Sequence, residues 1–105
     1  MKLVIAIVSK DDGQNVIDAL REAGFYSTTL ATTGSFFKIG NTTLMIGTDK
    51  PEECIQVIEK EAKKRKEIVT TGAITELSGY PVLPIDTEVG GATIFVLDVE
   101  QFIKL

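Results

Sequence analysis

The residues best suited to chemistry lie in one stretch, between residues 28 and 43, where polar side chains surround two aromatic rings. Hydroxyl groups and loop N–H groups bind phosphate oxygens, and a turn of successive N–H groups forms an anion-binding nest. Phe36 or Phe37 can act as a platform for a base. The simpler interpretation is that the threonines favour β-structure on a solvated face and that the phenylalanines pack at an interface. The polar and glycine members of the stretch are Thr28, Thr29, Thr32, Thr33, Gly34, Ser35, Asn41, Thr42 and Thr43.

The composition argues against an enzyme and against a resident metal or cofactor. The chain has no histidine, the commonest general base and metal ligand, and one cysteine, Cys54. Cys54 falls on the apolar face of a predicted helix, which indicates inert packing. The pair Asp11–Asp12 is better explained as a helix cap than as a metal site. We therefore expect no catalytic residue, no metal site and no cofactor.

The net charge of −4 argues against a nucleic-acid polymer or an anionic membrane as the partner. It remains compatible with a small phosphorylated ligand. The apolar run 3–8 is too short to span a membrane or to form the core of a signal peptide. These observations predict a cytoplasmic protein without membrane insertion.

The pattern of apolar residues, glycines and prolines predicts two helices and five strands. The first helix has Val16, Leu20 and Ala23 on its inner face, and the second has Cys54 and Ile58. Gly90-Gly91 interrupts a long final strand, where it marks a bulge or a close approach. The predicted order is strand 3–8, helix 12–23, strand 25–33, loop 34–41, strand 42–48, helix 50–66, strand 68–71, loop 72–84, strand 85–97 and a helical turn at 99–103.

Two further patterns bear on the second helix. Asp49 and Glu52 have the spacing of a capping box, with Pro51 in the first turn. The basic run 63–66 suits the carbonyl end of the helix dipole and is interpreted as a solvated helix end.

The order β-α-β-β-α-β predicts an α+β fold of the ferredoxin-like kind, a single domain over residues 1–105 with an additional short strand. Both helices then cover one face of an antiparallel sheet. The first and last strands are apolar on both faces, however, so the second face also needs a cover. A neighbouring copy of the chain is the simplest one, and we expect an oligomer.

Two segments resemble the PII-like cyclic-di-AMP receptor family. The first is 30–43, LATTGSFFKIGNTT, and the second is 88–96, EVGGATIFV. The resemblance extends over essentially the whole chain. It implies a homotrimer that binds cyclic di-AMP in the clefts between subunits, near the base of the loop 34–41. Ligand binding in the family orders the loops and so changes which downstream protein the trimer can meet.

The resemblance also implies roles for individual residues. Thr28 and Asn41 would hydrogen-bond phosphate or adenine edges, and Gly47 and Gly91 would let the ligand approach the backbone. The family usually has asparagine at the position of Gly24 and arginine at the position of Tyr26; Tyr26 can stack or donate through its hydroxyl. The implied ligand-binding residues are Tyr26, Thr28, Phe36, Phe37, Asn41, Gly47 and Gly91.

Three functions remain open at this point. The first is a PII-like signal-transduction protein that binds cyclic di-AMP. The second is a PII-like trimer that binds another adenine nucleotide or a metabolite. The third is a scaffold that binds no nucleotide and presents its loops to a partner protein.

Overall fold

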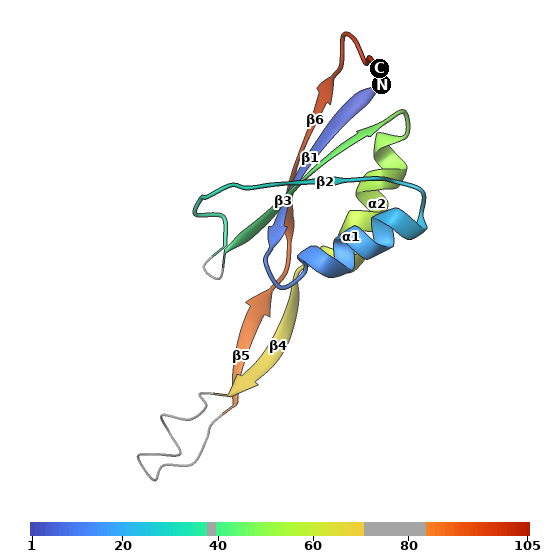
Figure 1. The fold of residues 1–105 in the computed structure, drawn as a ribbon. Coiled ribbons are helices and arrows are strands. Elements are labelled where there is room, and N and C mark those ends of the chain that lie inside the picture. Colours follow the sequence, from blue (N-terminus) through green and yellow to red (C-terminus); the bar gives the residue numbers. More distant parts are fainter. Residues whose placement is uncertain (38–39, 71–83) are drawn as a thin grey trace.

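A computed structural model describes residues 1–37, 40–70 and 84–105 of the chain (Figure 1). The two helices are α1 (Gly13–Glu22) and α2 (Pro51–Ala62). The strands are β1 (Lys2–Ser9), β2 (Thr28–Leu30), β3 (Asn41–Thr48), β4 (Arg65–Thr70), β5 (Pro84–Val89) and β6 (Ala92–Asp98).

Four strands form an antiparallel sheet in the order β2-β3-β1-β6. β1 is central, as its unbroken apolar run predicts, and pairs with β3 on one side and β6 on the other. The helices follow β1 and β3, so the chain order around this sheet is β-α-β-β-α-β. The predicted ferredoxin-like α+β fold is confirmed.

The hydrophobic core lies between this sheet and the two helices, which share one side of it (Figure 1). Alternate residues of a strand face opposite sides of a sheet, so every second residue of β1 and β3 enters the core. Each fully buried aliphatic side chain contributes about 1.5–3 kcal/mol. The core residues are Val4, Ala6, Val8, Val16, Leu20, Leu44, Ile46, Cys54, Ile58 and Ala62.

Cys54 is fully buried among apolar side chains, as its helical position predicts. Burial raises the pKa of its thiol to about 11, because a thiolate would lose its hydration there. The thiol is therefore protonated at neutral pH and lacks the thiolate that a nucleophile requires.

The opposite face of the sheet carries a second set of apolar side chains, which we call the open face. Strand register places Ile5 beside Met45 on one side and Phe95 on the other, and Leu3 beside Leu97. Phe95 and Leu97 are 50% and 45% exposed. Neither α1 nor α2 covers this face, so large apolar side chains remain in contact with water in the single chain (Figure 1).

β4 and β5 pair with each other in a separate two-stranded sheet, which we call the arm. It projects from the end of the core, beyond the termini of β1 and α2 (Figure 1). The interruption predicted at Gly90-Gly91 is confirmed, but the two parts belong to different sheets, so the strand 85–97 is wrong as one element. Gly90 and Gly91 have φ angles of 87° and 92°, in the left-handed region, and this turn sends β5 and β6 into different sheets.

Both predicted side-chain caps are wrong. Asp12 occupies the position before α1, but its carboxylate makes no capping hydrogen bond. The same holds for α2, which Lys50 precedes in place of Asp49. There the Thr48 hydroxyl accepts the backbone N–H of Lys50 at 2.9 Å and organises the turn into the helix. Local spacing indicated where the helices begin, but the two carboxylates bind other groups. Asp12 pairs with Arg65, and Asp49 pairs with the amino group of Met1.

Several predicted boundaries also need correction. The strand 25–33 is reduced to β2, and the strand expected from residue 68 begins at Arg65. Ala23 is exposed at the end of α1, and residues 99–103 form no helical turn. Apart from Pro84, the predicted loop 72–84 lies outside the described residues.

Candidate functional site

Two of the hollows on the described surface contain predicted ligand residues. The larger, which we call the front pocket, has a volume of about 580 Å³ and lies between the β1–α1 corner, the loop after β2 and the base of the arm. The smaller, the rear pocket, has a volume of about 350 Å³ and lies where α1 ends and α2 begins. Volumes of this size can take part of a nucleotide-sized ligand.

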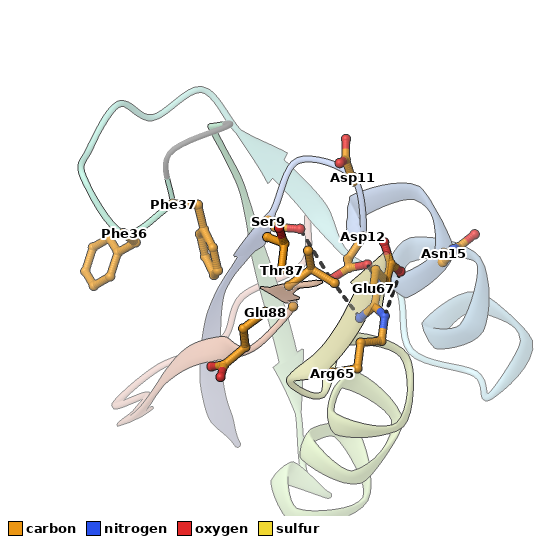
Figure 2. Close-up of a pocket in the computed structure, with 12 residues that line it drawn as sticks. Ser9, Asp11, Asp12, Asn15, Phe36, Phe37, Arg65, Glu67, Thr87 and Glu88 are labelled. Carbon is orange, nitrogen blue, oxygen red and sulfur yellow. Dashed lines mark hydrogen bonds and ion pairs between the residues drawn. The ribbon is translucent and has the colours of Figure 1, made fainter. Parts of the chain in front are cut away.

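Three separate segments build the front pocket (Figure 2). The corner between β1 and α1 contributes Ser9 and Asp12, and the arm contributes Arg65 and Thr87. Phe36 and Phe37 come from the loop after β2 and lie across the hollow from the acidic corner (Figure 2). The pocket thus has one aromatic wall and one charged wall.

An ion pair joins two of these segments. Arg65 Nη2 donates to Asp12 Oδ1 at 2.7 Å, and Ser9 Oγ donates to Asp12 Oδ2 at 3.3 Å (Figure 2). The Asp12 side chain is 4% exposed and that of Arg65 is 35% exposed. The hydrogen bond with Asp12 raises the pKa of Arg65 above its usual value, so the guanidinium stays charged.

Arg65 makes two further contacts on its own side of the pocket. Its Nε donates to Glu67 Oε1, and its Nη1 donates to the Lys63 carbonyl, both at 3.2 Å. The interpretation of the run 63–66 as a solvated helix end is therefore wrong: α2 ends at Ala62, and Arg65 and Lys66 belong to β4. A planar guanidinium can serve three acceptors at once, which a lysine ammonium cannot do with the same geometry.

The front pocket carries an excess of negative charge. Four carboxylates and one guanidinium line it, a formal excess of three negative charges. Such a wall repels phosphate but accepts hydrogen bonds from the amino group of a base. The charged groups are Asp11, Asp12, Glu67, Glu88 and Arg65.

The structure distributes the seven predicted ligand residues over both hollows and the sheet. Phe36 and Phe37 line the front pocket, and Gly91 follows its lining residue Gly90. Tyr26 and Gly47 line the rear pocket. The remaining two, Thr28 and Asn41, line neither hollow.

Three of the seven share the open face. Asn41 and Gly47 stand an even number of residues from Met45 on β3, so all three face the same side of the sheet. Thr28 is the register partner of Met45 and faces that side too. The predicted ligand residues of the sheet therefore lie on its uncovered face.

These residues extend along the length of the sheet. Gly47 pairs with Leu3 at one end of β1, and Asn41 pairs with Ser9 at the other. A strand rises about 3.3 Å per residue, so about 20 Å separates the two ends. The rear pocket belongs to the Gly47 end and the front pocket to the Asn41 end.

Asn41 carries an unsatisfied polar atom. Its Oδ1 is buried and has no hydrogen-bond partner among the residues that the structure describes. Buried polar atoms are almost always paired, so an acceptor without a donor is an exception that needs a reason. A ligand or a neighbouring chain that supplies an N–H or O–H would satisfy it.

The sequence reasoning missed Arg65 and Glu67 as lining residues and assigned Asp12 to a helix cap. Fifty-three positions separate Asp12 from Arg65, so no local spacing connects them. The available signal was composition: Arg65 is the one arginine within a run of lysines, and arginine is the usual choice for a geometrically defined ion pair.

Comparison with known proteins now decides the family. The model of the cyclic-di-AMP receptor family matches residues 1–105, the whole of the sequence. This chain belongs to the cyclic-di-AMP receptor family. The resemblance seen in the segments 30–43 and 88–96 is thereby confirmed.

A solved structure agrees with the fold of this family member. A crystal structure of a functionally unknown protein from Pediococcus pentosaceus ATCC 25745 is 38% identical in sequence, with a TM-score of 0.81. The match covers 99% of this chain and 96% of that one.

Two observations concern sites of other kinds. Within residues 1–37, 40–70 and 84–105, no group of three or more histidine, cysteine or acidic side chains is placed to hold a metal ion. In the same ranges, no helix is long and apolar enough to cross a membrane.

Proposed function

We propose that this protein is a homotrimeric signalling receptor that binds cyclic di-AMP in the clefts between its subunits and responds by changing its loops. It functions as one domain over residues 1–105 and binds its ligand without catalysing a reaction. One observation carries the proposal: Thr28, Asn41 and Gly47 lie on the apolar face of the sheet that its own helices leave open. Membership of the receptor family supports the choice of ligand.

The open face supports self-association. Phe95 and Leu97 expose about half of their surface there, beside the half-buried Ile5 and Met45. Burial of apolar area contributes roughly 25 cal/mol per Å², so covering this face favours association. Closed symmetric oligomers cover such a face with copies of itself and leave no apolar surface unpaired.

The separation of the two pockets supports a site shared between subunits. The residues that should contact the ligand lie at opposite ends of the sheet, about 20 Å apart on one chain. When copies meet through their open faces, the front end of one subunit can lie against the rear end of another. Tyr26 and Gly47 of one subunit would then complete a site with Phe36, Phe37 and Asn41 of its neighbour.

Charge supports a particular orientation of the ligand. The excess of carboxylates in the front pocket disfavours phosphate there and suits an adenine, whose amino group donates and whose ring stacks on Phe36 or Phe37. The phosphodiesters then lie over the sheet, where Thr28 and the amide of Asn41 can donate to them.

Titration calorimetry tests the proposal. Cyclic di-AMP should bind the wild-type protein, and Asn41→Ala should weaken binding about 10- to 100-fold, because hydrogen bonds to charged groups contribute about 1.5–3 kcal/mol. Gln56→Ala, on the exposed side of α2, is the matched control and should bind as the wild type does. Cyclic di-GMP should produce no heat. Absence of heat with cyclic di-AMP would reject the proposed ligand.

A second candidate has support from the same charges. Tyr26 is neutral, and the front pocket is acidic, so the described pocket walls offer little positive charge to a dianionic ligand. This favours an uncharged adenine-bearing metabolite in the same cleft between subunits, whereas another adenine nucleotide would meet the same shortage of positive charge. Heat with ATP or adenosine but none with cyclic di-AMP would select this candidate. If the trimer binds none of these compounds, the result would favour the third function, a scaffold that presents its loops to a downstream protein.

A further inference from the structure

Among the described residues, the contacts that attach the arm to the core lie at its base. β4 and β5 pair with each other and with no strand of the four-stranded sheet. At the base of the arm, the Gly91 N–H donates to the carbonyl of Ala62, and Arg65 pairs with Asp12. A two-stranded ribbon is marginal by itself, so these groups decide how firmly the arm is held.

The Asp12–Arg65 pair is built as a fixed contact. The carboxylate of Asp12 is almost fully buried and accepts from both Arg65 and Ser9. Gly90 lies so close that a Cβ there would stand 2.7 Å from Arg65 Nη1. The partly exposed guanidinium therefore lies between the acidic corner and the glycine turn, with its planar fork oriented by three acceptors.

The same pair joins the two segments that form the charged wall of the front pocket. Asp12 belongs to the core wall with Asp11 and Asn15, whereas Arg65 belongs to the arm wall with Glu67 and Glu88 (Figure 2). The pocket has its described shape only while the two walls are held together. A ligand that fills the pocket would lie against both segments and would reduce the access of water to the ion pair.

We propose that the Asp12–Arg65 ion pair is a latch that positions the arm on the core. The latch couples ligand binding in the front pocket to the attachment of the arm. Water exclusion strengthens an ion pair, so an occupied pocket holds the latch more firmly. Linkage is reciprocal, so an opened latch must weaken binding in the pocket by the same factor. Asp12 and Arg65 are positioning residues that act through the arm. The coupling to ligand rests on the proposed function, whereas the positioning of the arm does not.

The first experiment tests the latch without ligand. Hydrogen exchange is compared between the wild type, Arg65→Met and Arg21→Met. Arg21 forms an exposed pair with Asp18 at 2.8 Å and is the matched control. In Arg65→Met, amides at the base of the arm, at residues 66–67 and 87–89, should exchange about tenfold faster or more, while those of β1 and β3 stay within about twofold. Arg21→Met should change neither set.

Three further variants separate the latch from a general loss of stability. If Arg65→Met does not fold, Arg65→Lys replaces it, since lysine keeps the charge but cannot serve Asp12, Glu67 and the Lys63 carbonyl together. Asp12→Asn should accelerate exchange of the same amides. The double variant Asp12→Asn/Arg65→Met should accelerate it no more than either single change does. Equal acceleration across arm and core, or additive effects of the two changes, would overturn the latch.

The second experiment adds cyclic di-AMP. In the wild type the ligand should slow exchange at the base of the arm, and in Arg65→Met both this protection and the affinity should fall about tenfold, with Arg21→Met unchanged. Ligand binding that leaves the arm unprotected in the wild type would refute the coupling. Absence of binding in every variant would reject the proposed ligand, while the ligand-free comparison still decides whether the latch positions the arm.

Discussion

At the scale of single residues, two glycines share the same φ angle but have different surroundings. Gly24 and Gly90 both have a φ of 87°, a conformation that side-chain-bearing residues rarely adopt. A Cβ on Gly24 would meet no atom within 4 Å, whereas one on Gly90 would stand 2.5 Å from the carbonyl oxygen of Lys63. At Gly24 only the backbone conformation requires glycine. At Gly90 close packing at the base of the arm requires it as well.

This pair allows strain and crowding to be separated. Gly24→Ala should destabilise the protein by about 1 kcal/mol, the cost of a left-handed L-residue. Gly90→Ala should cost about 1–3 kcal/mol more, because the added methyl must displace backbone. Urea denaturation at one fixed protein concentration measures both, since the stability of an oligomer depends on concentration. Equal losses in the two variants would show that the crowding at Gly90 relaxes without cost.

At the scale of elements, each helix begins with a support other than the expected side-chain cap. Asp12 precedes α1, and its buried carboxylate accepts from the partly exposed Arg65, a charge-assisted contact that is stronger than one capping hydrogen bond. α2 begins after a turn in which the Thr48 hydroxyl accepts from Lys50, and its first turn contains Glu52 and Glu53 near the positive end of the helix dipole.

The turn before α2 predicts a measurable effect. Thr48→Val removes the acceptor of the Lys50 N–H and keeps the side-chain volume, so unfolding should become easier by about 1 kcal/mol. Thr48→Ser retains a hydroxyl and should keep the hydrogen-bond contribution, which makes it the control. Thermal or urea unfolding of the two variants gives the comparison. If the valine variant is as stable as the serine variant, the turn does not depend on this hydrogen bond.

At the scale of the whole molecule, the main question is what lies against the open face. The helices cover one side of the sheet, and Leu3, Ile5 and Phe95 on the other side meet water in the single chain. An apolar sheet face of this kind is rarely left uncovered in a stable protein. The proposed trimer would cover this face and would place Thr28, Asn41 and Gly47 at the clefts between subunits.

A charge on this face should therefore prevent assembly. Light scattering of the wild type at micromolar concentration should give the mass of a trimer. Phe95→Lys should shift it toward the monomer, because the ammonium would be buried without a partner. Gln56→Lys adds the same charge to the exposed side of α2 and should leave the mass unchanged. A monomeric wild type, or a trimeric Phe95→Lys variant, would contradict assembly through this face.

The sequence by itself determined the elements and the core. The apolar run of β1, the alternation in β3 and the apolar stripes of the two helices can be recognised without knowing what they pack against, because a strand or helix repeats its geometry locally. These stripes contain Val16 and Leu20 in α1 and Cys54 and Ile58 in α2. The order of these elements was sufficient to predict the ferredoxin-like fold. The two segments around Phe36 and Gly91 were sufficient to indicate the receptor family.

Only the tertiary structure decided how the site is arranged. Asp12 and Arg65 meet across 53 positions, so no local spacing encodes their contact. The sequence predicted an interruption at Gly90-Gly91, but the separation of β5 and β6 into different sheets depends on the packing of that turn against the end of α2. Strand register alone places Thr28 and Asn41 on the open face, and a shift by one residue would send both into the core. Contacts between distant segments follow from how the elements pack, which local periodicity does not specify.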